Sequence, residues 1–443
     1  MPNRTIPART LALCVLAAAC STGLRAQNVK PPKAQLWMDV STGSMAGMPE
    51  MEMPAGLGGM AGMLGGMMGG GGAGGRSGAS TAYGQARGMS VMPPRVLDIA
   101  FHNSLKPGVE AAQLIPPGMR MGESLPLLPP RREPAGTPRE REPGEPPTEV
   151  ERPKGRILVY WGCGETVRAG QPRVVDFARG SPSDFASAFA GRHVPDRGAR
   201  IGPNHVLYPN ERNTVVLARD SSLAGEHRIQ GAGVPASMKF SLGAAQDLMP
   251  AIQLQSRGTL RDSVALSWSP VAHARGYYLH AMASQGNDMV LWSSAEAPDT
   301  GMGLFDYLPN ATIERWTRER VLLGADVTQC AVPKGIFAPA PGAREDAGAM
   351  LRMIAYGGES NFAHPPRPAD PKATWEPEWA VRVRVKSHTM AMLGQEQGAS
   401  SAGGQPSPTA GADAQAPSPA AEQPQEQLRL PSPGSILRGI LGR

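Results

Sequence analysis

The residues with the sharpest chemical signature are methionines near the start of the chain. They recur every few residues in a stretch rich in glycine, and those that could act together as ligands are Met45, Met48, Met51, Met53, Met60 and Met63. Thioethers are soft ligands that select Cu(I), and a flexible segment could wrap one ion with three of them. The pattern predicts either a Cu(I) site or a low-complexity segment that binds no ligand.

The first residues of the chain predict export. Two arginines precede an apolar run from Leu11 to Ala19, which is the arrangement of a secretory signal peptide. A retained transmembrane helix would need about 20 apolar residues. Two processing sites compete: cleavage before Cys20 with acylation of that cysteine, as in a lipoprotein, and cleavage after Ala26. Either one places the protein in the periplasm or at the cell envelope. The signal peptide is 1–26 for cleavage after Ala26, and a shorter lipoprotein signal ends at Cys20 in the other case.

Two cysteines, Cys163 and Cys330, lie in the body of the chain. In an oxidising compartment such a pair forms a disulfide, and the alternative is two buried free thiols. A bridge would stabilise the fold by constraining the unfolded chain. The spacing matches neither a CxxC redox motif nor a Cys and His zinc motif.

A search for catalytic motifs finds neither HExxH nor GxSxG, and no phosphate-binding glycine loop. Polar residues gather in two loop-rich regions. The first contains Asp176, Asp184, His193 and Asp196, and the second contains Glu359, Asn361 and His364. Either group could serve an unrecognised hydrolase, although scattered polar residues are expected in loops. His280 alternates with Tyr278 and Met282, which favours a half-buried structural role.

The elements that must position these residues are strands. Residues 250–292 contain four short apolar runs, each closed by Gly, Pro, Asn or Asp. In the second run Val264, Leu266 and Trp268 share one face, because side chains two apart in a strand point the same way. An apolar sheet face must be covered, so the pattern predicts a β-sandwich.

This part of the chain resembles a fibronectin type III domain. The resemblance rests on Trp268, the following Ser-Pro-Val, and Tyr277-Tyr278-Leu279, and later on the runs 350–358 and 379–385. It covers roughly 250–390 and implies an immunoglobulin-like β-sandwich over 249–394, without an activity of its own. Residues 296–348 are longer than the family's middle connections. They contain a predicted helix from Thr312 to Val321, whose Trp316 should pack on the sandwich.

Residues 93–248 predict a β-rich unit, either separate from the sandwich or sharing a sheet with it. The predicted strands are 96–102, 124–128, 156–163, 171–177, 215–217, 227–229 and 237–242, and a short helix is predicted at 183–189. A Pro-rich loop at 129–154, with acidic and basic residues interleaved, interrupts this unit.

The two ends of the chain differ in composition from the body. Residues 27–92, rich in Gly and Met apart from a short strand pattern at 36–40, predict a segment without fixed structure. Residues 395–443 are rich in Pro, Ala and Gln and predict a disordered tail. Its last residues, 435–443, could form a short amphipathic helix at a membrane surface.

The charge of the chain argues against nucleic acid as a partner. The net charge of +6 is small for 443 residues, and no basic run or stacking motif supports nucleic-acid binding. Arg382, Arg384 and Lys386 alternate with valines on the last predicted strand. This stripe is interpreted as the solvated face of the strand, or as a charged edge.

Together these features predict an exported, non-enzymatic envelope protein that acts as a binding or structural module and needs no cofactor. Its partner would be an envelope protein or surface component, and acylated Cys20 or the C-terminal tail would attach it to a membrane. The alternatives are a periplasmic Cu(I)-binding protein and a hydrolase.

Overall fold

The computed structural model describes residues 28–48, 83–91, 94–130, 155–176, 179, 191–339, 348–370 and 372–394. Over these residues the protein is mainly β with several sheets, as the alternating patterns predict. The signal peptide, the loop 131–154, the helix at 183–189 and the tail from 395 lie outside the described residues.

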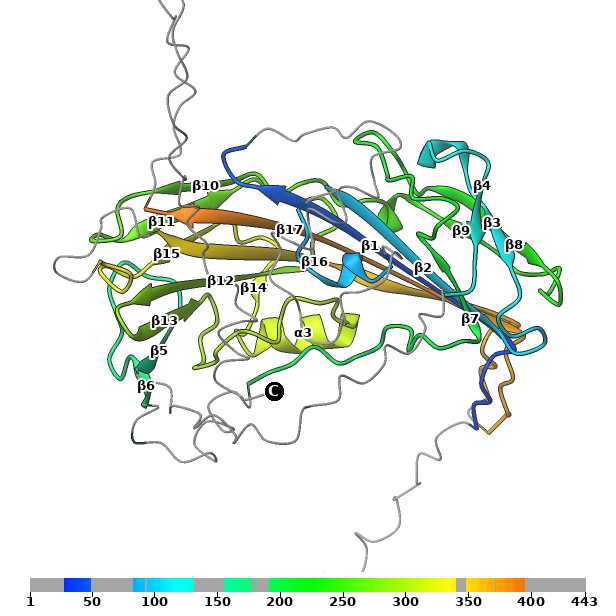
Figure 1. The fold of residues 1–443 in the computed structure, drawn as a ribbon. Coiled ribbons are helices and arrows are strands. Elements are labelled where there is room, and N and C mark those ends of the chain that lie inside the picture. Colours follow the sequence, from blue (N-terminus) through cyan, green and yellow to red (C-terminus); the bar gives the residue numbers. More distant parts are fainter. Residues whose placement is uncertain are drawn as a thin grey trace, which may run out of the picture.

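A ten-stranded sheet organises the molecule (Figure 1). Nine strands follow the order β6, β5, β13, β12, β16, β17, β1, β2, β7, and β14 pairs with β12. Neighbours in this sheet are antiparallel except β1 with β17 and β5 with β13. The strands are β1 Ala34–Met45, β2 Arg95–Asn103, β5 Arg156–Trp161, β6 Arg173–Asp176, β7 His205–Tyr208, β12 Gly276–Gln285, β13 Asp288–Ser293, β14 Leu323–Gly324, β16 Ala349–His364 and β17 Trp379–Leu393.

Two small sheets cover the apolar face of the large one. The first contains β10 Leu254–Arg257, β11 Val264–Trp268 and β15 Gln329–Val332, and the second contains β4 Ser124–Leu127, β3 Ala111–Leu114, β8 Gly225–Gly231 and β9 Lys239–Leu242. One continuous core joins all three sheets. Within it, Trp268 of β11 meets Tyr277 of β12 edge to face at 5.5 Å between ring centroids. The predicted face of Val264, Leu266 and Trp268 is therefore buried, as a sandwich requires.

The opposite face of the large sheet is covered by helix and irregular segments. Helix α3, Asn310–Arg318, packs Ile313 and Trp316 against Tyr278, Ile354 and Tyr356. Figure 1 shows α3 below the long strands, with β10 and β11 above them. The single-turn helices η1 Gln85–Arg87, η2 Pro117–Met119 and η3 Ala244–Gln246 lie in connections. The predicted packing of Trp316 is confirmed, since this side chain is 5% exposed.

The strands of the predicted first unit are divided between the large sheet and a separate four-stranded sheet. β2 and β7 extend one edge of the large sheet and β5 and β6 extend the other, while β3, β4, β8 and β9 form their own sheet. The first unit therefore shares a sheet with the later strands. The predicted strand at 215–217 is wrong, because its backbone binds side chains instead of a neighbouring strand. The Val215 N–H donates to Asn213 Oδ1, and the Val215 carbonyl accepts from the Tyr208 hydroxyl.

The short strand pattern at 36–40 is confirmed, and the prediction that the rest of 27–92 lacks fixed structure is wrong for residues 34–35 and 41–45. Residues Ala34–Met45 together form β1, which pairs with β17 along one edge and with β2 along the other. Leu36, Met38 and Val40 are fully buried in the common core. Burial on one face and hydrogen-bonded partners on both edges offset the entropy of ordering this strand.

The interpretation of Arg382, Arg384 and Lys386 as a solvated stripe is also wrong. Arg384 and Lys386 are each 1% exposed, and the Arg382 side chain is 19% exposed. β17 is an interior strand, and segments from 83–91, 191–198 and 305–307 lie over this face. Alternation along one strand identifies which residues share a face but does not reveal what covers it.

Candidate functional site

Strand register gathers an ionic cluster on the covered face of the large sheet. Asp39 of β1 is the register partner of Arg384 on β17 and also of Asp98 on β2. Lys386 lies two residues further along β17 and therefore on the same face. Four charged side chains from three strands thus meet within the sheet, although Asp39 and Asp98 are about three hundred residues from Arg384 and Lys386 in the sequence.

Asp39 and Arg384 form the centre of this cluster. Arg384 Nε donates to Asp39 Oδ1 at 2.6 Å and Nη2 donates to Oδ2 at 2.5 Å, so the pair is bidentate. Their side chains are 3% and 2% exposed. The guanidinium also lies 4.5 Å from the centre of the Tyr307 ring. Burial lowers the pKa of Arg384, but attraction and hydrogen bonding to Asp39, together with the smaller effects of Tyr307 and Asp306, raise it above its ordinary value.

Lys386 is held without a direct carboxylate partner. Its Nζ donates to three backbone carbonyls, those of Arg87, Gly88 and Phe305, at 2.9 to 3.2 Å. The ammonium group also lies 4.7 Å from the Tyr307 ring centre. Burial lowers the pKa of Lys386 to about 8, against a partial increase from Asp306. The three carbonyls fix the 87–88 and 305 segments over β17.

Asp98 contributes the second carboxyl group. Its Oδ2 accepts from the backbone N–H groups of Gly84 and Ala86 at 3.0 and 2.8 Å, which anchors η1 over the sheet. Burial raises the pKa of Asp98 well above its usual value, and the neighbouring Asp39 charge raises it further. Part of this shift comes from the repulsion between two carboxyl groups that face each other across adjacent strands.

Two further ionic groups surround this centre. Arg87 binds Asp306 with Nε at 2.8 Å and Asp196 with Nη2 at 2.9 Å. On β16, Glu359 Oε1 lies 3.3 Å from Arg197 Nη2 and 3.6 Å from Arg382 Nε. The Glu359–Arg197 pair ties the 191–198 segment to the sheet, and the Arg87 pairs tie η1 to that segment and to Asp306. The whole arrangement neutralises charge internally and holds irregular segments in place.

Two buried histidines lie on the same face. His388 Nε2 is 2.8 Å from the Ser90 carbonyl, and His280 Nε2 is 2.8 Å from the Thr300 carbonyl. Burial lowers the pKa of each to about 3. Both therefore stay neutral at pH 7, and each fixes a loop over the sheet. His280 is fully buried, whereas its strand position predicts a half-buried side chain.

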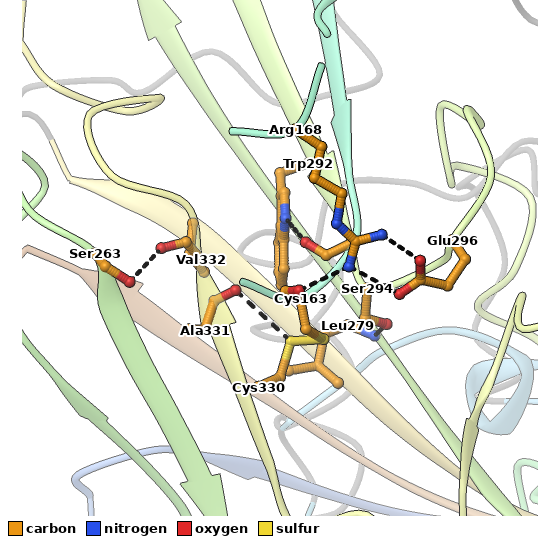
Figure 2. The surroundings of a disulfide bond; sticks show 11 residues. Cys163, Arg168, Ser263, Leu279, Trp292, Ser294, Glu296, Cys330, Ala331 and Val332 are labelled. Atoms are coloured by element: carbon orange, nitrogen blue, oxygen red, sulfur yellow. Dashed lines mark hydrogen bonds and ion pairs between the residues drawn. A yellow bond between two sulfur atoms is a disulfide. The ribbon is translucent and has the colours of Figure 1, made fainter. Parts of the chain in front are cut away.

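The disulfide joins two sheets (Figure 2). Cys163, just after β5, is bonded to Cys330 of β15, with the Cα atoms 5.2 Å apart. The surrounding chain is fixed by Trp292 Nε1, which donates to the Gly162 carbonyl at 3.0 Å, and by Arg168 Nη2, which donates to the Cys163 carbonyl at 2.9 Å. The bond connects one edge region of the large sheet to the three-stranded sheet, and it is the pair expected from the sequence.

A cavity of about 350 Å³ lies beside a bulge in β16. Its lining includes Gln246, His273, Arg275, Asn310 and the bulge residues 357–358. A Cβ at position 357 would lie 2.5 Å from Val385 Cγ2, so only glycine fits there. Arg275 is already paired with Glu314 and Asn310 binds the Glu359 backbone, so these lining groups are occupied within the protein.

Several of the polar residues considered for a hydrolase lie in separate places within the described part of the chain. Asp176 lies at the end of edge strand β6, whereas Asp196 binds Arg87 above the interior strands. Asp184 is outside the described residues. Asn361 Nδ2 does bind Glu359 Oε1 at 3.0 Å. His364 instead stacks on Trp379 at the far end of β16, with 5.9 Å between ring centroids.

The proposed Cu(I) ligands are only partly within the described residues. Met45 ends β1, and Met48 follows it with 53% of its surface exposed. Met51, Met53, Met60 and Met63 lie outside the described residues, as does Cys20. Among the residues that the structure describes, no group of three or more His, Cys, Asp or Glu side chains could hold a metal ion.

The ionic cluster was missed as a unit by sequence reasoning. The only local signal was the alternation of Arg382, Arg384 and Lys386 with valines, and nothing near Asp39 or Asp98 marks them as partners. Finding the cluster would have required the pairing of β1 with β17, which joins chain segments separated by more than three hundred residues.

Comparison of the chain with known protein families, with curated proteins and with solved structures finds no match. Within the described part of the chain, no helix is long and apolar enough to cross a membrane.

Proposed function

We propose that this protein is an exported, non-enzymatic module of the cell envelope that binds or supports another envelope component. The observation that carries the proposal is the bond between Cys163 and Cys330. Structural disulfides form and persist in oxidising compartments and are rare in the cytosol of most organisms. The bond agrees with the signal-peptide pattern of residues 1–26, which is an independent indication of export.

The disposition of charge supports a structural use of the polar residues. Arg384 is paired with Asp39, Arg87 with Asp306, and Glu359 with Arg382 and Arg197. Within the described part of the cluster, Lys386 and Asp98 bind backbone groups of the same chain. Such networks hold loops in one arrangement, and a rigid, extended sheet suits a protein that presents a surface to a partner.

We also propose that 249–394 is a fibronectin type III-like unit, enlarged at both edges. The three-stranded sheet β10, β11, β15 faces the run β13, β12, β16, β17 of the large sheet, which is a sandwich arrangement. The buried Trp268 and its contact with Tyr277 agree with the residues on which the resemblance rests. Units of this type commonly bind or space other modules, so the proposal favours interaction over catalysis.

Cell fractionation combined with intact-mass analysis tests this proposal. The expected result is a polypeptide outside the cytoplasm that begins at Gln27 or at acylated Cys20. Its mass should be two hydrogens lower than that of the reduced chain, and Cys163 and Cys330 should resist alkylation until a reductant is added. Native protein that keeps residues 1–26, with both thiols free in the cytoplasm, would refute it.

A second candidate function is Cu(I) binding. The observation that favours it is that Met45, where the methionine-rich segment begins, is the register partner of Met390 on β17. The segment therefore starts beside a methionine from the far end of the chain. Anaerobic titration of the mature protein with Cu(I) tests this function, and the absence of any bound ion would exclude it.

A further inference from the structure

Methionines from three neighbouring strands form a row across the large sheet. Met282 of β12 is the register partner of Met350 on β16, and Met350 is the register partner of Met392 on β17. Directly paired residues on adjacent antiparallel strands have Cβ atoms about 4.5 to 5.5 Å apart and point to the same side. Met350 therefore stands between Met282 and Met392 on the same side of the sheet.

These methionines do not belong to the common core. Met353 of β16 and Met38 of β1 point to the other face of the sheet and are fully buried in that core. Met392 is 40% exposed, and Met282 and Met350 are half-buried. The row is therefore accessible to solvent at one end of the face that carries the ionic cluster.

A second pair of methionines lies beside the row. Met390 is two residues before Met392 on the same face of β17, and its partner on β1 is Met45. Both are half-buried. The row of three and this pair together bring thioethers from β1, β12, β16 and β17 to one end of the sheet, at the point where the methionine-rich segment leaves β1.

The chemistry of the row selects a soft monovalent ion. Methionine is long and unbranched, so sulfur atoms on three adjacent strands can converge on one ion. Neutral thioethers bind Cu(I) well and bind hard cations such as Mg²⁺ or Ca²⁺ poorly. The row itself contains no carboxylate or imidazole. Arg352 lies two residues after Met350 on the same face of β16. Its guanidinium lies over the Phe305 ring at 4.2 Å, and its Nη2 contacts Met302 Sδ and His280 Nδ1.

We propose that Met282, Met350 and Met392 form a Cu(I) site on the large sheet, with Met390 and Met45 as neighbouring thioethers. This inference rests on the second candidate function and gives it a defined location. It assigns the ligands to the folded body, whereas the ligands of the sequence pattern, apart from Met45, lie in the segment that follows β1.

The test uses the full mature protein with [methyl-¹³C]methionine and an anaerobic Cu(I) titration against a coloured Cu(I) chelator, repeated with Ag(I). The sheet variant is Met282→Leu/Met350→Leu/Met392→Leu, in which leucine preserves volume. The matched control is Met353→Leu, which alters a methionine on the other face of β16. A segment variant carries Met51→Leu, Met53→Leu, Met60→Leu and Met63→Leu.

We expect one ion to bind to the wild type, the control and the segment variant with similar affinity. The sheet variant should bind at least tenfold more weakly. In the wild type, Ag(I) should shift the methyl signals of Met282, Met350 and Met392 and leave that of Met353 unchanged. These shifts need no substitution, so they test the site even if the sheet variant folds poorly.

Other outcomes distinguish failure of the sheet site from failure of Cu(I) binding altogether. Loss of binding in the segment variant alone, with unshifted signals from Met282 and Met350, would overturn the sheet site and leave Cu(I) binding by the N-terminal segment in place. No binding to the wild type would overturn the sheet site and the second candidate function together. Neither result would bear on export of the protein.

Discussion

Replacing one member of the Asp39–Arg384 pair should destabilise the fold severely. Arg384→Met leaves the Asp39 carboxylate opposite Asp98, with Arg382 and Lys386 as the remaining cations on that face of β17. Asp39→Leu leaves the Arg384 guanidinium without its bidentate acceptor. Removing one partner from a buried pair costs about 3–5 kcal/mol, because an uncompensated charge stays in the interior.

The double variant Asp39→Leu/Arg384→Met should recover most of this loss. It removes both charges, and replacement of a buried pair by apolar residues of similar volume is often neutral or stabilising. We expect the double variant to lie within about 2 kcal/mol of the wild type, so that the coupling between the two sites is several kcal/mol. An exposed bidentate pair, Arg212–Glu110, is the matched control, and its coupling should be below about 1 kcal/mol.

Guanidinium chloride unfolding, followed by tryptophan fluorescence and circular dichroism, measures these values. The two single variants, the double variant and the wild type form one thermodynamic cycle, and the Arg212 and Glu110 variants form another. If the losses of the two single variants simply add in the double variant, Asp39 and Arg384 do not act as a pair. If the exposed pair couples as strongly as the buried one, burial is not the cause.

Three other predictions concern covalent and proton-linked stability. Reduction of the Cys163–Cys330 bond, which spans a sequence separation of 167, should lower the unfolding free energy by up to about 5 kcal/mol; equal midpoints for oxidised and reduced protein in guanidinium chloride would contradict this. Lys386 releases its proton near pH 8 when folded and near 10.5 when unfolded, so the unfolded chain binds more protons in between. The unfolding free energy of the wild type should therefore rise between pH 8 and 10.5 by up to about 3 kcal/mol relative to that of Lys386→Met. If the unfolding free energies of the two proteins change in parallel with pH, Lys386 is not the group responsible. His280 and His388 have folded pKa values of about 3, below the ordinary 6.5, so stability should fall as pH drops from 6.5 towards 3. Thermal melts of wild type and His388→Asn over that range test this, since the variant should lose part of the dependence.

The amino-acid sequence by itself determined the class of fold. Alternation in 250–292 and 379–385 is a local property of a strand with one buried face, and the turn residues between runs mark where each strand ends. The helix containing Trp316 followed from its 3.6-residue period in the same way. With only two cysteines in the body, the disulfide had one available pairing, and the fold brings those two residues together.

Only the tertiary structure decided the register and the covering of faces. Asp39, Asp98 and Arg384 meet because β1 inserts between β17 and β2, and no local pattern in residues 27–92 specifies that insertion. Register likewise places Met282, Met350 and Met392 in one row. The physical reason is that a two-residue period shows which side chains share a face. Partner strands and covering loops depend instead on packing between segments far apart in the chain.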